Sequence, residues 1–148
     1  MDKFTGRVWV LGDDIDTDII IPTEYLALKT IDDMKQYGFS PLRPELAGQI
    51  QKGDIIVAGK NFGCGSSREQ APEIIKAMGV QCVIAKSFAR IFFRNSINNG
   101  LLLIEQPDLY DDMKEGDEIT VVMNEHVDYN GKEYSIASLP ENLMSIIQ

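Results

Sequence analysis

The chain has 148 residues, with 14 Lys and Arg against 23 Asp and Glu, which gives a formal net charge of −9. Its hydrophobic content of 44% and charged content of 25% are typical of a globular domain and exclude a disordered chain. An acidic chain without a basic stripe is poorly suited to nucleic acid, because it cannot neutralise phosphates. Its longest apolar runs span four residues, far short of the roughly 20 that cross a bilayer.

Cysteine and histidine are scarce: the sequence contains only Cys64, Cys82 and His126. Two cysteines form neither a disulfide framework nor a four-ligand metal centre, and one imidazole excludes any site that needs two. The first residues lack the apolar segment of a secretory signal. We therefore predict a single domain over residues 1–148 that holds no metal ion itself and works in the cytoplasm.

Short β-branched runs between turn residues predict buried strands. These runs lie at 7–11, 55–58, 82–85 and 101–104. Helices are predicted between the later runs, over 68–78 and from an N-cap at Ser87 to a stop at 98–100. The alternation of strands and helices predicts an α/β fold with parallel strands.

Residues 22–53 are less regular, because Pro22, Pro41 and Pro44 interrupt any long element. We predict a loop-rich excursion within the domain here, with one short helix near 31–37.

A hairpin is predicted near the end of the chain, where strand-like runs over 119–123 and 132–136 flank Asn130-Gly131. Asn-Gly is favoured in two-residue hairpin turns because both positions accept a positive φ. The expected fold is therefore an α/β domain with a C-terminal β-hairpin.

The segment from Gly59 to Glu69, GKNFGCGSSRE, has the composition of an anion-binding loop. A predicted strand leads into three glycines, after which Ser66, Ser67 and Arg68 open a helix. Backbone N–H groups at a helix start bind anions, glycine allows close approach, and an arginine fork fits a carboxylate or phosphate. The segment does not have the spacing of a Walker A, dinucleotide or nucleophile-elbow motif.

Helix capping is the alternative interpretation of the two serines, because Ser66 with Glu69 and Ser67 with Gln70 both fit a capping box. Capping accounts for one serine, but not for the glycines, both serines and the arginine together. On spacing alone, a structural cap and an anion-binding or catalytic site both remain open.

Four aspartates fall within residues 13–18, but their spacing does not match a calcium-binding loop. Most of them are expected in solvated turns. Asp18 differs, because it directly precedes the apolar run at 19–21 and a carboxylate at such a boundary needs a partner. Arg68 is a candidate for that partner.

Four other residues receive structural interpretations. His126 lies in a strand-like stretch near the predicted hairpin, where a surface or packing role is favoured over metal binding. Cys64 stands between glycines near a helix start, a setting that can lower a thiol pKa, but packing is favoured because no base is identified for it. Arg90 and Arg94, one turn apart, are expected to form salt bridges or to face a partner.

Three segments together resemble one family, the small swivelling subunits of the aconitase superfamily. They are GDDIDTDIIIP over 12–22, NFGCGSSRE over 61–69 and SFARIFFRNSINNG over 87–100. They occur in the order of the family, and the resemblance extends over essentially the whole chain. Within the superfamily, the sequence is most similar to the small subunits of 3-isopropylmalate dehydratases.

The resemblance implies a swivelling β/β/α domain that docks on a separate large subunit, as a heterodimer or heterotetramer. In this family the large subunit holds a 4Fe–4S cluster through three cysteines, and its open iron acts as a Lewis acid. The implied reaction dehydrates and rehydrates a C-alkyl malate, with 3-isopropylmalate of leucine biosynthesis as the expected substrate.

The resemblance also implies roles for individual residues. Ser66 matches the serine that removes the proton next to a carboxylate, and Asp18 matches an aspartate of the catalytic site. Ser67, Arg68 and Thr17 match positions that bind the substrate.

Substrate choice in the family follows the loop after residue 22, where this chain has Leu26, Ala27 and Leu28. Relatives that bind an additional carboxylate tend to have arginine there, which would pair with it. Apolar residues in this loop favour an alkyl substituent instead. Related hydro-lyases of the 2,3-dimethylmalate, citraconate, maleate or homoaconitate type remain alternatives, as does a non-catalytic anion-binding module.

Overall fold

The computed structural model describes residues 3–65 and 68–136. Within these residues one sheet is formed by β1 (Lys3–Val10), β2 (Ile55–Ala58), β3 (Cys82–Ala85), β4 (Leu102–Glu105), β5 (Glu118–Val122), β6 (His126–Tyr129) and β7 (Lys132–Ser135). The strand order is β4-β3-β2-β1-β5-β6-β7. Neighbours from β4 to β1 are parallel, and β5 to β7 extend the sheet with antiparallel pairs.

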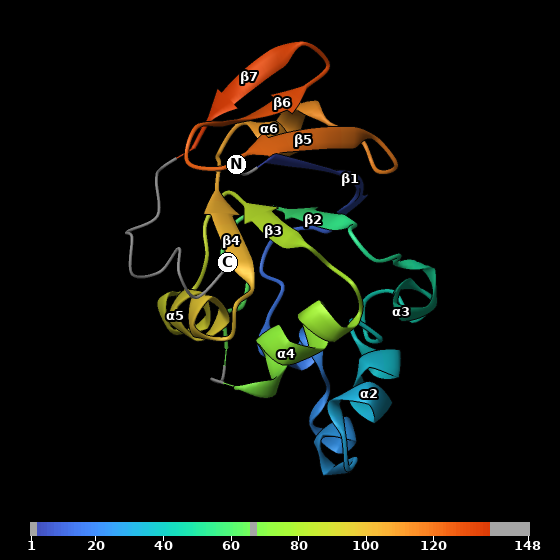
Figure 1. Ribbon diagram of the computed structural model, residues 1–148. Helices are drawn as coiled ribbons and strands as arrows, with labels where there is room; N and C mark the ends of the chain where they lie inside the picture. The colour runs from blue at the N-terminus through green and yellow to red at the C-terminus, as the bar shows by residue number, and fades with distance from the viewer. Residues whose placement is uncertain (1–2, 66–67, 137–148) are drawn as a thin grey trace.

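Helical elements occupy the connections between the strands. They are α1 (Thr17–Ile20), η1 (Thr23–Ala27), α2 (Ile31–Met34), η2 (Lys35–Tyr37), α3 (Leu46–Gln49), α4 (Gln70–Ala77), α5 (Arg90–Asn98) and α6 (Leu109–Asp112), where η denotes a 3-10 helix. Figure 1 shows α2 to α5 on one side of the parallel strands, with β5 to β7 and α6 on the other. None of the helices in the described part of the chain is long and apolar enough to cross a membrane.

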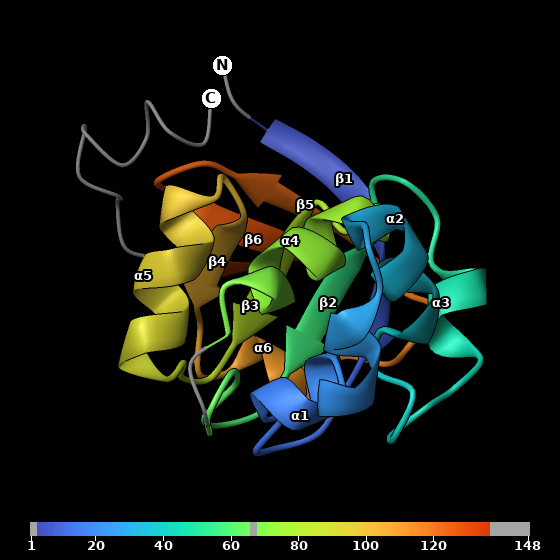
Figure 2. The ribbon, with the colours of Figure 1, turned by 90° about the horizontal axis from the view of Figure 1, so that it is seen from below.

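The parallel strands are buried on both faces because two different layers cover them. On one face, Ile56 packs in a core with Ile74 of α4, which lies across the strands in Figure 2. On the other face, Ile84 packs in a second core with Val121 and Val127 of the antiparallel strands. The sheet therefore curls over its own parallel half, which explains the unbroken apolar runs of β2 and β3.

The predicted α/β arrangement is confirmed for the parallel strands. The predicted ranges 55–58 and 82–85 coincide with β2 and β3, and β4 is displaced by one residue from 101–104. The first strand begins at Lys3, earlier than the predicted 7–11, because residues 3–7 form the antiparallel ladder with β5.

Two helix starts differ from the prediction. Helix α4 begins at Gln70 rather than at residue 68. Helix α5 begins at Arg90, so the predicted N-cap at Ser87 is wrong. The Ser87 hydroxyl instead accepts a hydrogen bond from the N–H of Asn61 at 2.8 Å, and the following residue pairs in a parallel β-bridge. Segment 87–89 is therefore an extended strap beside the glycine-rich loop.

The excursion at 22–53 contains more helix than the single short one predicted. The expected helix near 31–37 is confirmed as α2 followed directly by η2. Two further elements, η1 and α3, were not predicted. Both are single turns of four or five residues, too short to give a recognisable apolar period.

The C-terminal hairpin is confirmed, but its first strand is β6 rather than the predicted 119–123. Asn130 and Gly131 have φ values of 53° and 82°, as a two-residue hairpin turn requires. Strand β5, close to the predicted run, pairs with β6 on the side away from β7. Three strands thus form a meander where two were expected.

Candidate functional site

Three loops meet at the carboxyl ends of β1, β2 and β3. The N–H of Gly63 donates to the carbonyl of Ile15 at 2.7 Å, which joins the second loop to the first. The N–H of Phe62 donates to the carbonyl of Ser87 at 3.0 Å, which joins the second loop to the third. Adjacent parallel strands present their carboxyl ends at one edge, where α/β sheets place their sites. The three segments that resemble the aconitase superfamily are therefore neighbours in space.

Glycine is required at the centre of these loops. Gly63 has a φ of 85°, and a Cβ there would lie 2.2 Å from Cγ of Phe92. Gly65 has a φ of 91°. The positive φ at both glycines allows a sharp turn, and the absence of a Cβ at Gly63 lets this loop lie directly against Phe92 of α5.

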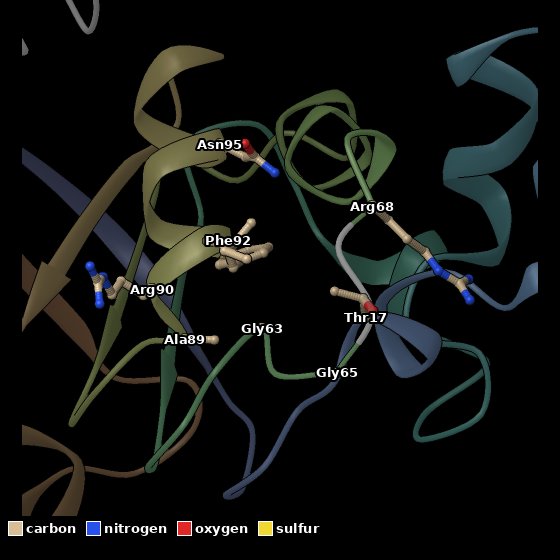
Figure 3. Close-up of a pocket in the computed structure, with 9 residues that line it drawn as sticks. Thr17, Gly63, Gly65, Arg68, Ala89, Arg90, Phe92 and Asn95 are labelled. Atoms are coloured by element: carbon tan, nitrogen blue, oxygen red, sulfur yellow. The ribbon is translucent and has the colours of Figure 1, made fainter.

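A cavity of about 200 Å³ lies between this loop and the start of α5. Figure 3 shows Phe92 and Asn95 reaching toward it from α5, opposite Gly63 and Gly65. Thr17, at the start of α1, is 2% exposed and closes another side. The lining consists of Thr17, Gly63, Gly65, Arg68, Ala89, Arg90, Ile91, Phe92 and Asn95.

Arg68 and Asp18 form an ion pair, as considered from the sequence. Nη1 of Arg68 also donates to the carbonyl of Ile21 at 3.0 Å, and Nη2 donates to Oγ1 of Thr23 at 2.9 Å. The arginine side chain is 13% exposed and the aspartate side chain 63%. The guanidinium group of Arg68 is directed toward α1, away from the middle of the cavity (Figure 3). Arg68 therefore links the cavity wall to α1 and η1.

The two predicted serines, Ser66 and Ser67, lie outside the described residues. Their neighbours on either side, Gly65 and Arg68, both line the cavity. The N-cap of α4 is Glu69, without a side-chain cap hydrogen bond. Neither capping box predicted for the serines matches this helix start.

The predicted specificity residues do not line the cavity. Leu26 and Ala27 belong to η1, and Leu28 is its C-cap. Leu26 and Leu28 are partly buried and pack against the core that contains Ile56 and Ile74, whereas Ala27 is exposed. This element begins at Thr23, which contacts Arg68, so the loop is connected to the site through the arginine.

Five cavity residues were not identified as site residues from the sequence: Ala89, Arg90, Ile91, Phe92 and Asn95. All five lie within the third segment of the resemblance, 87–100. Phe92 and Asn95 are three residues apart on α5, so they share a helix face. That spacing was the available signal, but it is equally typical of a helix face that only packs against the core.

The surroundings of the Cys64 thiol disfavour its thiolate form. Burial, followed by the charges of Asp16 and Asp14, raises its pKa above the ordinary value. The suggestion that the helix start lowers this pKa is therefore wrong, because α4 begins six residues later. The packing role favoured for Cys64 is consistent with this environment.

The chain's own cysteines do not fit an iron–sulfur cluster. Cys82 is wholly buried in the core on the face of the sheet away from α4 and α5, where burial raises its pKa strongly. Cys64 alone lies near the cavity, and a cluster needs several thiolates. A cluster is not held by these residues.

His126 belongs to the hairpin. Its Nε2 lies 3.1 Å from Oδ1 of Asp128 and 3.6 Å from Oε2 of Glu133. In Figure 1, β6, the strand of His126, lies on the other side of the parallel strands from α5, which lines the cavity. This group is separate from the cavity.

Comparison with known proteins identifies the family. The aconitase C-terminal domain family matches residues 18–109. The chain is 76% identical to the 3-isopropylmalate dehydratase small subunit of Lachnospira eligens, over 99% of this chain and 89% of the relative. It is 50% identical to 3-isopropylmalate dehydratase small subunit 1 of Archaeoglobus fulgidus, over 97% and 90%.

A solved structure supports the same assignment. The crystal structure of 3-isopropylmalate dehydratase (LeuD) from Methanocaldococcus jannaschii superposes with a TM-score of 0.92 and 38% sequence identity. The match covers 99% of this chain and 88% of that one. The chain therefore belongs to the aconitase C-terminal domain family, among the small subunits of 3-isopropylmalate dehydratase.

Proposed function

We propose that this chain is the small subunit of an iron–sulfur-dependent hydro-lyase that isomerises 3-isopropylmalate in leucine biosynthesis. The convergence of three family segments around one cavity is the observation that carries the proposal. Relatives that match nearly the whole chain bear the name 3-isopropylmalate dehydratase small subunit. A small subunit requires a large one, and we assign the 4Fe–4S cluster, as a Lewis acid, to that partner in the cytoplasm.

Ser66 is the proposed base. It removes a proton from the carbon next to a substrate carboxylate, while hydroxide leaves the adjacent carbon and a double bond forms between the two. Return of water in the opposite orientation gives the isomer. A serine hydroxyl is a weak base, so its surroundings must favour the alkoxide. Backbone N–H groups of the glycine-rich segment and the Arg68 cation are the stabilising groups available nearby.

Arg68, with Ser67 and Thr17, is proposed to bind substrate carboxylate. A guanidinium binds a carboxylate through two parallel N–H groups. Because the guanidinium already contacts Asp18, Ile21 and Thr23, the substrate must share it or displace one of these partners. Asp18 is proposed to hold the arginine in position before the substrate arrives.

The loop at Leu26, Ala27 and Leu28 is proposed to receive the alkyl group. Leu26 and Ala27 belong to η1, and the first residue of η1, Thr23, accepts a hydrogen bond from Arg68. A substrate held by the arginine therefore extends toward η1. No arginine stands at these three positions to pair with an additional carboxylate. An isopropyl group is therefore preferred over a third carboxylate.

The test is an anaerobic affinity purification of the tagged chain from its native lysate, followed by mass spectrometry. We expect a stoichiometric large subunit that carries an iron–sulfur chromophore. Recovery of the chain alone, together with unaided binding of small diacids, would instead identify an independent anion-binding module.

A further inference from the structure

Helix α5 has an outer face that is turned largely to the solvent. Ile91 is 61% exposed, more than any other large hydrophobic side chain in the described part of the protein. At 100° per residue, Arg90, Ile91, Arg94 and Asn98 fall within an arc of about 100° on the helix. All four residues are exposed. We call these four residues the α5 face.

The two arginines of the α5 face are available to a partner. Neither Arg90 nor Arg94 forms an ion pair within residues 3–65 and 68–136. This outcome differs from the salt bridges considered from the sequence. Helix α5 itself contains no Asp or Glu, although the whole chain has a net charge of −9. The α5 face is therefore a cationic patch on an acidic protein.

The α5 face borders the cavity. Arg90 and Ile91 contribute to the cavity lining together with Phe92 and Asn95. In Figure 3 the side chains of Phe92 and Asn95 are directed toward the cavity, whereas that of Arg90 is directed away from it. One side of α5 therefore forms the cavity wall, and the neighbouring side is turned to the solvent at the rim.

We propose that the α5 face is a docking surface for the large subunit, with Ile91 in apolar contact and both arginines opposite acidic groups. This inference rests on the proposed function. Because Cys64 and Cys82 cannot hold a cluster, a partner that supplies it must cover the cavity, and covering the cavity brings it against the rim. An exposed isoleucine beside arginines that have no ion-pair partner among the described residues is typical of an interface anchor bordered by charge.

The partner surface follows from the same chemistry. It presents an apolar depression for Ile91, bordered by Asp or Glu side chains within ion-pair distance of Arg90 and Arg94. The ion pairs of Arg90 and Arg94 with these acidic groups lie at the edge of the interface, where charges mainly accelerate association. The isoleucine, buried on docking, mainly slows dissociation.

The experiment measures association of the purified full chain with its purified, cluster-loaded large subunit under anaerobic conditions. We expect Ile91→Asp to weaken binding by about tenfold or more, chiefly through faster dissociation. We expect Arg94→Glu to slow association several-fold at low salt, with a smaller effect at high salt. Aspartate at the second residue of α5 suits a helix N-terminus, so the first variant is expected to fold.

Two substitutions outside the α5 face serve as matched controls. Leu42→Asp changes another exposed aliphatic side chain, which is 42% exposed, and Lys52→Glu reverses another exposed cation. Both are expected to bind like the wild type. Thermal unfolding of each free variant identifies any loss of fold.

The outcomes are separable. If the wild type and Ile91→Asp bind the large subunit equally well, the docking assignment is wrong and the proposed function stands. If the wild type binds no large subunit, both are wrong. Light scattering of the free chain covers a third case: a dimer that Ile91→Asp converts to a monomer would make the α5 face a contact between two copies, against the proposal.

Discussion

Asp18 and Arg68 connect α1 to the segment that precedes α4, although they are far apart in the sequence. The other acceptors of the guanidinium, Ile21 and Thr23, lie within five residues of Asp18. One arginine thereby fixes the relative position of the first two site loops. The cavity and the proposed specificity loop meet at this side chain.

Arg68→Lys is expected to raise the KM for 3-isopropylmalate in the reconstituted complex by about tenfold or more, with a smaller effect on kcat. An ammonium group cannot reproduce the planar, bidentate contact of a guanidinium with a carboxylate. Steady-state kinetics measure both constants. An unchanged KM would show that Arg68 is structural.

Asp18→Asn is the matched change on the other side of the ion pair. Because the carboxylate is largely solvated, its loss is expected to cost less than about 1 kcal/mol in the free energy of unfolding. The effect on KM should be larger than this stability change suggests, because Arg68 loses its charged partner. Chemical denaturation and kinetics on the same preparation separate the two effects.

Gly63→Ala is expected to destabilise the domain by about 2–5 kcal/mol. Roughly 1–2 kcal/mol comes from a side chain at positive φ, and about 1–3 kcal/mol from overpacking against Phe92. Gly116 provides the control, because it has a φ of 94° but no atom within 4 Å of a Cβ. Denaturant unfolding compares the variants, and equal losses for Gly63→Ala and Gly116→Ala would contradict close packing at Phe92.

Cys64 is expected to react slowly with iodoacetamide at neutral pH, because its burial and nearby aspartates raise the thiol pKa. Asp16→Asn removes one of those charges, lowers the pKa and should accelerate the reaction, while asparagine can still cap α1. Cys82 should react only after unfolding, because it is wholly buried. Peptide mapping locates the label, and rapid native labelling of Cys64 would contradict this environment.

Tyr134 links stability to alkaline pH. Burial and then its hydrogen bond to Asp112 raise its pKa to about 12, from about 10 in an unfolded chain. The unfolded state therefore loses its proton first, and stability falls between pH 10 and 12. Tyr134→Phe should be less stable than the wild type at neutral pH, but its stability should fall less over this interval. Denaturation experiments across this pH interval measure the stability of both proteins. An equal loss of stability in the wild type and in Tyr134→Phe would exclude Tyr134 as the titrating group.

The parallel strands were predictable because they contain short apolar runs, each of which begins within a few residues after a glycine. The start of α5 was not, because Ser87 fits the local pattern of an N-cap. Its hydroxyl is used by Asn61, a contact set by tertiary structure. The predicted first strand was too short for a similar reason, since residues 3–6 are ordered by pairing with β5.

The candidate site was only partly predictable. Asp18 and Arg68 were paired from their chemistry, because a carboxylate beside an apolar run needs a cation. Phe92 and Asn95 were missed as cavity residues, because helical spacing alone does not show which face of α5 meets the glycine-rich loop. The clash that a Cβ at Gly63 would make with Phe92 identifies the side of α5 that faces the loop, but only after the position of Phe92 is known.

The most direct test of the account is the turnover of 3-isopropylmalate by the chain mixed with its purified large subunit, with Ser66→Ala and Ser67→Ala measured beside the wild type. The account predicts activity only in the mixture and a loss of about 10²–10⁴-fold in kcat for Ser66→Ala, the contribution expected of a general base. Complex formation should persist, and Ser67→Ala should mainly affect KM. Turnover by Ser66→Ala within a few-fold of the wild type would contradict the assignment of Ser66 as the base.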